Sequence, residues 1–406
     1  MKKRSYILVL FLVISIGLLG FTIGKNTLNM ERTTVEEDFD AHEEIVKEVV
    51  SEEIIETIEE PKIIAINLLA AGDIMFHSPQ YKAAYIKESD SYDFIPTFQH
   101  IKRYVEDADI ALANFETVTA GKEIGYKSYP RFNTPKESIL AIKETGFDIL
   151  STANNHSLDH GKKGIISTID NINEYGMKNI GTYKEANTPI LIEDIKGINI
   201  GFLSYTYGLN GLDSLLNEEE LSYMVNRIDE DKIKKDIIKT KDLGVDMTVV
   251  FVHWGNEYQR DPSPYQIELG EKMVEWGANI ILGSHPHVIQ NSQIVDKDGK
   301  DNFIIYSMGN FLSNQRKETL NNSYTEDGVM INLEIEKNFS TEETIIKNIS
   351  YIPTWVHKYR ENDKLHYEIL PVKEILGGSL DIMVSDTVKS RLEKSLADTM
   401  DKMVEN

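Results

Sequence analysis

Short apolar runs alternate along the chain with amphipathic stretches from Lys62 onward. The runs have the length of strands, whereas the longer stretches repeat their apolar positions with the period of a helix. This alternation is typical of a layered α/β domain rather than of a sandwich or a helix bundle. The predicted strands are residues 63–71, 110–115, 147–153, 198–205, 246–253, 278–284 and 302–311, and helices are predicted at 135–144, 163–175, 229–243 and 264–276.

Glycines mark where the predicted helices end. Gly146, Gly176, Gly244 and Gly277 each follow a helical stretch, at the position where a left-handed cap is expected. Beyond Asn310 the pattern becomes rich in β-type segments, at 328–335, 343–351 and 365–370, and ends in a predicted helix at 385–403. We expect these segments to complete the same domain. The predicted organisation is a cytoplasmic N-terminus with a membrane anchor (1–30), an acidic spacer (31–62), a layered domain (63–380) and a C-terminal helix (381–406).

The N-terminus has the features of a membrane anchor. Lys2, Lys3 and Arg4 precede an uncharged apolar run over residues 6–24, which is long enough to span a bilayer. Basic residues before such a run place the N-terminus in the cytoplasm. No A-x-A-like cleavage site follows, so a retained single-pass anchor is favoured, with a cleaved signal peptide as the alternative. The main domain is then expected outside the cytoplasm, at the cell membrane.

The distribution of charged residues along the chain limits the classes of molecule that the protein is expected to bind. Residues 31–60 contain thirteen acidic side chains against Arg32 and Lys47, and so supply 11 of the 23 net negative charges. This segment is either a stalk helix or a solvated spacer. The rest of the chain has no cluster of basic and aromatic residues, so nucleic acid is not an expected partner. The sequence has no cysteine, which excludes disulfides, thiolate metal ligands and a cysteine nucleophile.

Residues that can bind metals follow nearly every predicted strand. In open α/β sheets, ligands collect at the carboxyl ends of the strands, so these side chains are expected to converge. Each one alone has an ordinary explanation, such as a turn at Asp73, a helix cap at Asn154 or a hydrogen-bonded core histidine at His253. Their repetition at five strand ends favours a shared metal site. The five segments are Gly72-Asp73 with His77, Asn114-Phe115-Glu116, Asn154-Asn155-His156, His253-Trp254 and His285-Pro286-His287.

These segments, in this order, resemble the calcineurin-like metallophosphoesterase superfamily. Five segments look particularly like its CapA branch, which is associated with poly-γ-glutamate capsule synthesis and also called PgsA. They are Gly72-Asp73-Ile74-Met75, Asn114-Phe115-Glu116, Asn154-Asn155-His156, Gly283-Ser284-His285-Pro286-His287 and Tyr306-Ser307-Met308-Gly309-Asn310-Phe311. The resemblance covers roughly residues 66–315. It implies a metallophosphoesterase-like fold in which β-sheets are flanked by helices.

The resemblance also implies roles for individual residues. Two divalent metal ions, Mn, Fe or Zn, would be bound, because carboxylate, amide and imidazole ligands suit such metals. Glu116 would bridge them, and His156 would protonate the leaving group after attack by a bridging hydroxide. Asp73, Glu116 and His287 would hold one ion, and Glu116, Asn155, His253 and His285 the other.

Two departures from the superfamily pattern affect the expected chemistry. Glu116 stands where aspartate is usual, and Met75 stands where a histidine is usual, which makes His77 a possible substitute ligand. Both differences point away from a standard phosphatase, although not away from metal binding. Further candidates for metal or substrate contact are Asn154, Arg131, His160 and Asn310.

Three functions therefore remain open at the level of the sequence. The first is a membrane-anchored, metal-dependent hydrolase or transferase that acts on poly-γ-glutamate or a related anionic envelope polymer. The second is a non-catalytic component that binds the polymer or the membrane polyglutamate synthase subunits. The third is a generic envelope phosphoesterase acting on a phosphoester substrate, because fold-level resemblance does not determine the substrate.

Overall fold

A computed structural model describes residues 62–380 and 382–404 of the chain. The predicted anchor at 6–24 and the acidic segment 31–60 lie outside the described residues. Within the described part of the chain, no helix is both long enough and apolar enough to cross a membrane.

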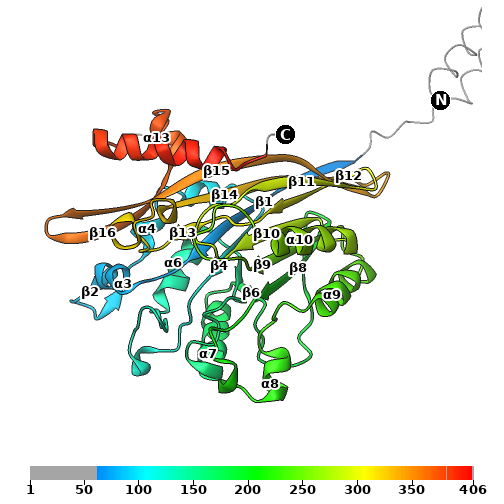
Figure 1. Ribbon diagram of the computed structural model, residues 1–406, viewed down its shortest axis with the longest axis horizontal. Coiled ribbons are helices and arrows are strands. Elements are labelled where there is room, and N and C mark those ends of the chain that lie inside the picture. The colour runs from blue at the N-terminus through cyan, green and yellow to red at the C-terminus, as the bar shows by residue number, and fades with distance from the viewer. Residues whose placement is uncertain (1–61, 381, 405–406) are drawn as a thin grey trace, which may run out of the picture. The chain divides into compact units, whose positions relative to one another are not determined.

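Two β-sheets form the centre of the fold (Figure 1). The larger sheet has eight strands in the order β16-β15-β14-β1-β4-β5-β6, with β13 pairing on β1, and the smaller sheet has six in the order β11-β12-β10-β9-β8-β7. The larger sheet consists of β1 (Ile63–Ile74), β4 (Ile110–Phe115), β5 (Ile149–Ser151), β6 (Lys178–Ile180), β13 (Asn310–Leu312), β14 (Asp327–Asn338), β15 (Glu343–Glu361) and β16 (Lys364–Pro371). The smaller sheet consists of β7 (Leu191–Ile195), β8 (Ile198–Thr206), β9 (Met247–His253), β10 (Ile280–Ser284), β11 (Ser292–Lys297) and β12 (Lys300–Ile305).

Alternation of side chains along the strands divides the interior into layers. One apolar cluster combines residues of both sheets, such as Leu68 of β1 and Val249 of β9, and so lies between them. Leu69, the next residue of β1, belongs to a second cluster with Ile142 of helix α6 (Glu137–Thr145), on the opposite face of the larger sheet. Val250, the next residue of β9, belongs to a third cluster with helices α9 (Glu230–Asp242) and α10 (Pro264–Trp276). The order of layers is therefore helices, sheet, sheet, helices.

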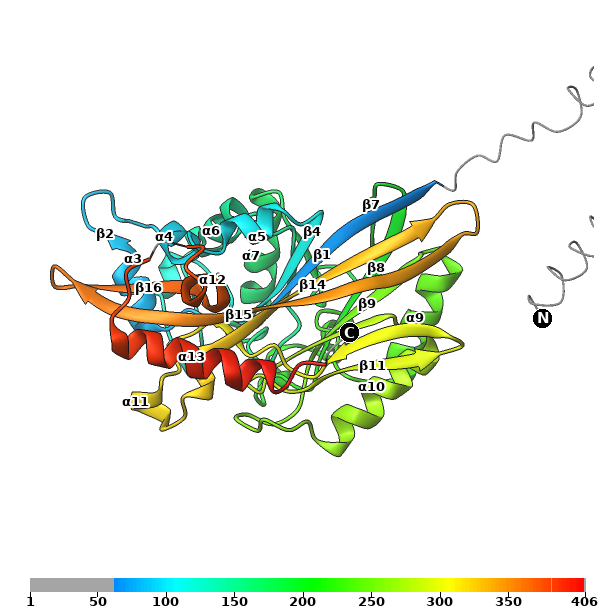
Figure 2. The ribbon, with the colours of Figure 1, turned by 90° about the horizontal axis from the view of Figure 1, so that it is seen from above.

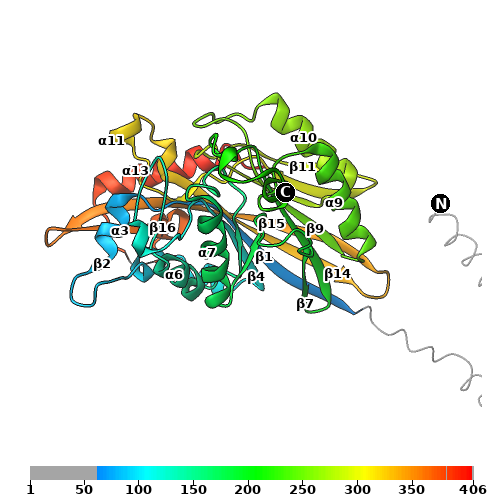
Figure 3. The same ribbon diagram turned by 90° about the horizontal axis from the view of Figure 1, so that it is seen from below.

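Helices cover the two outer faces (Figure 3). Helices α3 and α6 lie on one side of the molecule and α9 and α10 on the other, while α13 runs along β15 (Figure 2). The helices are α3 (Ser78–Ala84), α4 (Ile95–Phe98), α5 (Lys102–Glu106), α6 (Glu137–Thr145), α7 (Gly161–Glu174), α8 (Glu218–Tyr223), α9 (Glu230–Asp242), α10 (Pro264–Trp276), α11 (Lys317–Leu320), α12 (Val372–Leu376) and α13 (Asp386–Met400). The strands β2 (Tyr85–Ile86) and β3 (Ser91–Tyr92) form a separate small hairpin.

The layered α/β class predicted from the sequence is confirmed, whereas one strand prediction is wrong. Residues 302–311 were expected to be a single strand, but β12 ends at Ile305 in the smaller sheet and β13 begins at Asn310 in the larger one. Gly309 has a φ of 70°, a left-handed conformation that breaks the strand. The chain therefore crosses from one sheet to the other between Tyr306 and Gly309.

Parallel strands of both sheets direct their carboxyl ends to one region. Strands β1, β4 and β5 are parallel neighbours in the larger sheet, and β8, β9 and β10 are parallel neighbours in the smaller sheet. Residues at or just after the carboxyl ends of these strands, from both sheets, lie close together.

Candidate metal centre

The predicted ligands come together from both sheets in a buried cluster. Asp73 lies near the end of β1, Glu116 follows β4, and His253 is the last residue of β9. All three are fully buried, and His285 and His287, which follow β10, are at most 4% exposed. Charged and ionisable side chains gathered in this way require compensation within the cluster.

Glu116 lacks that compensation. Neither carboxylate oxygen has a hydrogen-bond partner, although both are buried. Its Oε1 lies 3.5 Å from Nε2 of His253 and 3.8 Å from Nε2 of His287. Burial, with a further contribution from the charge of Asp73, raises the pKa of Glu116 well above its ordinary value. A buried carboxylate without partners is unfavourable, and a bound cation is the group that would stabilise it.

Two of the neighbouring histidines, His253 and His285, are kept neutral. Burial lowers the pKa of His253 well below its ordinary value and lowers the pKa of His285 to about 3. Nδ1 of His253 lies 2.9 Å from Oγ of Ser284, which leaves Nε2 facing Glu116. Nδ1 of His285 is buried without any partner. Neutral imidazoles with an available nitrogen are the form that binds metals.

Asp73 and Asn155 complete the cluster. Asp73 accepts a hydrogen bond from Nδ2 of Asn114 at 2.7 Å, and its other oxygen lies 3.2 Å from Nδ1 of His287. Oδ1 of Asn155 lies 3.0 Å from Nε2 of His253. One oxygen of Asp73 and the side-chain oxygen of Asn155 thus each lie beside an imidazole nitrogen of the cluster.

The ligand atoms of two groups are close enough to hold cations. Those of Glu116, His253 and His285 lie within 4.8 Å of one another, as do those of Asp73, Glu116 and His287. Glu116 is common to both groups. A third group joins Glu257 to the two residues His285 and His287. Together with the unpartnered atoms of Glu116 and His285, these spacings show that the residues fit divalent cations, without identifying the metal.

The histidine turn after β10 has an uncommon backbone conformation. His285 has a φ of 98° and His287 a φ of 58°, both in the left-handed region that side chains other than glycine rarely adopt. Gly283, just before this turn, packs so closely that a Cβ atom there would lie 2.0 Å from the backbone oxygen of Tyr306. Such conformations concentrate at functional sites, where the surrounding structure holds them.

His156 lies beside the cluster with its own carboxylate partner. Its Nδ1 is 2.8 Å from Oδ2 of Asp159, and its ring contacts Phe132 edge-on at 4.7 Å. The same Asp159 oxygen accepts a hydrogen bond from the backbone of Phe132 at 2.6 Å, which fixes the carboxylate. A carboxylate on one ring nitrogen sets the tautomer and orients the other nitrogen for proton transfer.

The remaining predicted residues support the cluster or lie at its edge. Asn154 donates to the backbone oxygen of Phe115, and its side-chain oxygen accepts from the backbone of His156, so it positions both neighbouring segments. Asn310 lies 3.1 Å from Nδ1 of His287 through its side-chain oxygen. Both amides therefore hold site residues in place.

His77, His160 and Arg131 lie outside the three groups of possible ligands. Nδ1 of His77 accepts a hydrogen bond from the backbone of Asn314 at 3.3 Å, and burial lowers its pKa to about 4. His160 immediately precedes α7 and has a buried Nε2 without a partner. Arg131 is exposed and donates through Nε to the backbone oxygen of Asp159.

Two residues of the site, Tyr207 and Glu257, were not predicted from the sequence, and Asn114 was predicted only as part of its segment. Asn114 anchors Asp73, Tyr207 places its ring 4.5 Å from that of His285, and Glu257 approaches both histidines that follow β10. Tyr207 follows β8 and could have been found because it, too, stands at a strand end. Glu257 had no comparable signal, because it lies four residues beyond its strand, in a loop.

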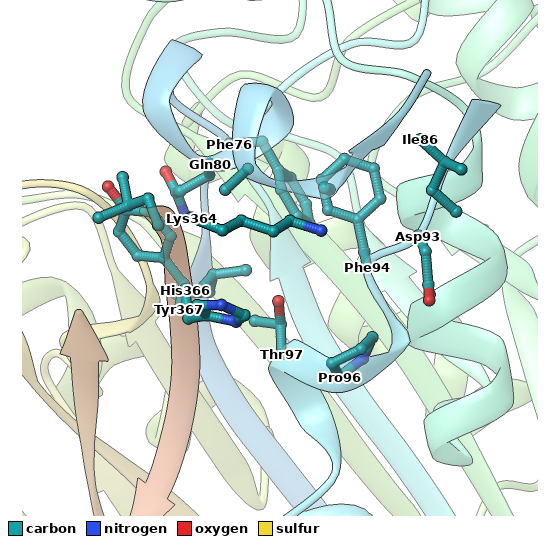
Figure 4. A pocket seen from close by; sticks show the side chains of 14 residues that line it. Phe76, Gln80, Ile86, Asp93, Phe94, Pro96, Thr97, Lys364, His366 and Tyr367 are labelled. Atoms are coloured by element: carbon teal, nitrogen blue, oxygen red, sulfur yellow. The ribbon is translucent and has the colours of Figure 1, made fainter. Parts of the chain in front are cut away.

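A cavity of about 190 Å³ is lined in part by the segment that follows Asp73 (Figure 4). Phe76 and Gln80, which follow Asp73 along the chain, line one side, and Tyr367 of β16 lines another. The side chain of Lys364 extends across it towards Phe94. None of the cluster residues lines this cavity, so it is separate from the candidate metal centre.

Comparison with known proteins assigns the family. A family model described as "Bacterial capsule synthesis protein PGA_cap" matches residues 67–315, which is more than half of the chain. The chain belongs to this family. The matched range includes every residue of the metal cluster, from Asp73 to His287.

Two CapA proteins from Bacillus species are similar in sequence. The capsule biosynthesis protein CapA of Bacillus anthracis is 31% identical over 261 residues, which cover 62% of this chain and 60% of that protein. The PGA biosynthesis protein CapA of Bacillus subtilis (strain 168) is 28% identical over 274 residues, which cover 66% of this chain and 67% of that protein. The match thus spans less than two thirds of the length of the B. anthracis protein.

Solved structures show only a distant similarity. The calcineurin-like phosphoesterase YfkN from Bacillus subtilis has a TM-score of 0.42 and 16% identity, over 84% of this chain and 99% of that one. A phosphatase from Mycoplasma pneumoniae has a TM-score of 0.42 and 12% identity, over 72% of this chain and 94% of that one. The family assignment therefore rests on the sequence match.

Proposed function

We propose that this PGA_cap protein is a metal-dependent hydrolase or transferase of capsule biosynthesis that acts on poly-γ-glutamate or a related anionic polymer of the cell envelope. The observation that carries the proposal is Glu116, a fully buried carboxylate whose two oxygens have no hydrogen-bond partner although His253 and His287 lie beside it. A polymer-binding surface would have no need for this arrangement. Membership of a capsule synthesis family supports the choice of polymer.

Two divalent cations account best for the cluster. Asp73, Glu116 and His287 would hold one, and Glu116, Asn155, His253 and His285 the other. When bound, such ions lower the pKa of a bound water and stabilise negative charge that develops on the substrate. The native metal is Mn, Fe or Zn, because the ligand set mixes oxygen and imidazole nitrogen.

The chain itself supplies a proton and a positive charge. His156, oriented by Asp159, is placed to donate a proton from its second ring nitrogen to the departing amine or alkoxide. Nε of Arg131 donates to the backbone oxygen of Asp159. Because Arg131 is exposed, the rest of its guanidinium group is available to a carboxylate of the polymer. Both groups lie on the side of the cluster formed by the larger sheet and the segments that follow it.

The decisive experiment compares turnover and metal content in one variant. The purified full chain, reconstituted with Mn²⁺, Fe²⁺ or Zn²⁺, is incubated with poly-γ-glutamate and with a panel of phosphoesters, and the products are separated by size. His156→Ala should lower turnover by about 10²–10⁴-fold while metal content is unchanged. His366→Ala, a histidine of an outer strand, should behave like the parent protein and serves as the control.

The alternatives make different predictions for the same variant. If His156→Ala leaves polymer production in cells intact, the protein acts as a binding component of the capsule machinery. Cleavage of phosphoesters but not of the polymer would indicate a generic envelope phosphoesterase. A protein without metal that takes up none on reconstitution would contradict the proposed metal centre.

Anchoring at the cell membrane is also part of the proposal. Its support is the apolar run of residues 6–24 behind three basic residues, which would keep the domain close to envelope polymer and to membrane synthase subunits. Removal of residues 1–30 should release the protein from the membrane fraction and abolish polymer production while turnover by the purified protein persists.

A further inference from the structure

Glu257 lies in a loop that bends back over the histidine turn. The loop follows His253, the last residue of β9, and leads towards α10. Glu257 is exposed, yet one of its carboxylate oxygens lies within 4.8 Å of ring nitrogens of both His285 and His287. The proximity of an exposed carboxylate to two buried imidazoles is not explained by the ligand set proposed above.

The loop around Glu257 is held in a defined shape. The backbone of Tyr258 donates to the backbone oxygen of Pro286 at 2.7 Å, which ties the loop to the turn between the two histidines. Tyr258 has a φ of 67°, uncommon for a bulky residue, and Gly255 has a φ of 85°. A Cβ atom on Gly255 would lie 2.6 Å from the side chain of Gln266. These contacts fix Glu257 beside the histidines.

A second set of contacts links the side chain of Tyr258 to His287. Nε2 of Gln315 lies 3.5 Å from the hydroxyl of Tyr258, and its oxygen accepts a hydrogen bond from Asn310 at 3.0 Å. Asn310 in turn contacts His287. Tyr258, the residue next to Glu257, is therefore tied to the histidine turn by its backbone, through Pro286, and by its side chain, through Gln315 and Asn310.

We propose that Glu257 is an additional metal ligand, which binds from the solvent side the cation that His285 would hold, next to His287. This inference rests on the metal centre proposed above. The loop after β9 then takes a direct part in the metal centre. Glu257 would be the exchangeable ligand, because it is exposed whereas the other two carboxylates, Asp73 and Glu116, are buried.

Charge and available atoms support this assignment. Asp73 and Glu116 contribute two negative charges, whereas two divalent cations would bring four positive charges, so a third carboxylate improves the balance. Nδ1 of His285 is buried, has no partner and belongs to a side chain only 4% exposed. A cation between this histidine and Glu257 would give the unpartnered imidazole nitrogen a partner. Of the described residues, Glu257 is the only exposed one among the three possible ligand groups.

The test measures metal binding rather than activity. The purified full chain is freed of metal with a chelator and titrated with Mn²⁺, and free Mn²⁺ is followed by electron paramagnetic resonance alongside calorimetry. The parent should bind two Mn²⁺ per chain. Glu257→Gln should weaken one of the two by about tenfold or more, which is the scale of removing a group that supports a metal. Glu257→Asp, which keeps the charge, should give an intermediate affinity.

A matched control separates this role from a general effect of charge. Glu185→Gln removes the same charge from another exposed glutamate and should bind both Mn²⁺ ions as the parent does. Circular dichroism and thermal unfolding of metal-free Glu257→Gln should match those of the metal-free parent, which shows that the fold is retained. Unchanged affinities for both ions in Glu257→Gln would overturn the proposal and leave the metal centre standing. Absence of any Mn²⁺, Fe²⁺ or Zn²⁺ binding in the parent would overturn both.

Discussion

Glu116 is the single residue of the candidate centre that a bound cation would stabilise most directly. Without a cation, Glu116 keeps a carboxylate in a fully buried position where neither oxygen has a partner. Its raised pKa expresses the same unfavourable burial. Protein interiors rarely tolerate such a group unless a charge compensates it. The residue is therefore expected to reduce the stability of the metal-free protein and to favour metal binding.

Replacement of this carboxylate should separate its two effects. Glu116→Gln keeps the shape but removes the charge, so the metal-free protein should gain about 1–3 kcal/mol in its free energy of unfolding. The same variant should lose measurable Mn²⁺ binding, because the residue belongs to both ligand groups. Urea unfolding with and without Mn²⁺ measures both quantities. A less stable metal-free variant with parental Mn²⁺ affinity would contradict this interpretation of Glu116.

His77 should make the stability of the metal-free protein dependent on pH. Burial lowers its folded pKa to about 4 from an unfolded value of 6.5. Between these values the unfolded chain binds a proton that the folded protein excludes, so stability falls as the pH drops from about 6.5 to about 4. His77→Gln cannot bind this proton. Urea unfolding between pH 7 and pH 4 should therefore show a smaller loss of stability for His77→Gln than for the parent, and equal losses would contradict the assignment.

How far the site could be predicted depended on where each residue stands in its segment. Asp73, Glu116 and His253 lie at or just beyond strand ends, so a strand pattern alone was enough to expect them together. The pattern could not show that His77 accepts a backbone hydrogen bond rather than joining a ligand group. It also could not predict that Glu257 lies near the histidines. The loop after β9 is held there by backbone contacts, which do not depend on a repeating pattern of apolar residues in the sequence.

At the scale of elements, the site depends on how closely two backbone segments pass each other. A Cβ atom on Gly72 would lie 2.1 Å from the backbone oxygen of Gly309, in the segment where the chain crosses between the sheets. The backbone of Asp73 donates to this oxygen at 3.0 Å. The end of β1 and the start of β13 are thus fixed together, and the ligand Asp73 with them.

A methyl group at this approach should disturb both the fold and the site. Gly72→Ala forces the backbone of Gly309 to move, and overpacking of this kind typically costs about 1–3 kcal/mol of stability. It should also weaken Mn²⁺ binding, because Asp73 moves with its strand. Gly208→Ala, where an added Cβ meets nothing within 4 Å and φ is not positive, is the control. Parental stability in Gly72→Ala, measured by urea unfolding, would show that the approach tolerates a side chain.

The C-terminal helix α13 is attached by a buried ion pair. Arg391 donates to Asp327 at 2.7 Å, and the hydroxyl of Ser395 donates to the same carboxylate oxygen at 2.6 Å. Asp327 is the first residue of β14 and only 2% exposed, and its burial raises its pKa to about 6 despite the arginine. The pair therefore connects the helix to the strand that lies next to β1.

Removal of one partner of this pair should cost more than removal of both. Arg391→Met leaves Asp327 buried without its cation, which typically destabilises a protein by about 3–5 kcal/mol. In the double variant Arg391→Met/Asp327→Asn the charge of Asp327 is removed as well, while Glu326, which also pairs with Arg391, keeps Arg316. Part of the loss should therefore be recovered. Thermal unfolding of the two variants measures the difference. Equal destabilisation would show that packing of α13, rather than charge, dominates.

Predictions of elements succeeded where one segment stays in one environment. Residues 110–115 and 264–276 form the expected strand and helix, and Gly146 and Gly277 adopt the left-handed cap with φ of 113°. The prediction for 302–311 was wrong because both halves are apolar and suited to strands, and only their partners differ. Which sheet a strand joins is decided by long-range pairing, and a local pattern contains no information about it.

At the scale of the whole molecule, the candidate centre connects the two sheets. Asp73, Glu116 and Asn155 come from strands of the larger sheet or the segments after them, whereas His253, His285 and His287 belong to the smaller sheet and its turns. A cation bound here would contact both halves of the interface at once. Because the unfolded chain separates these residues widely along the sequence, it cannot bind the cation in the same way, and binding adds directly to the stability of the fold.

Metal binding should therefore raise the unfolding temperature of the whole described domain. At a free Mn²⁺ concentration of 100 times its Kd, each ion should contribute about 2.7 kcal/mol. A chelator should remove this contribution in one cooperative transition, since both sheets contribute ligands, rather than loosen a single loop. Thermal unfolding followed by circular dichroism, with Glu116→Gln as the variant that should not respond, measures the effect. Stabilisation confined to local protection of the loops, without a shift of the global transition, would place the metal at one sheet only.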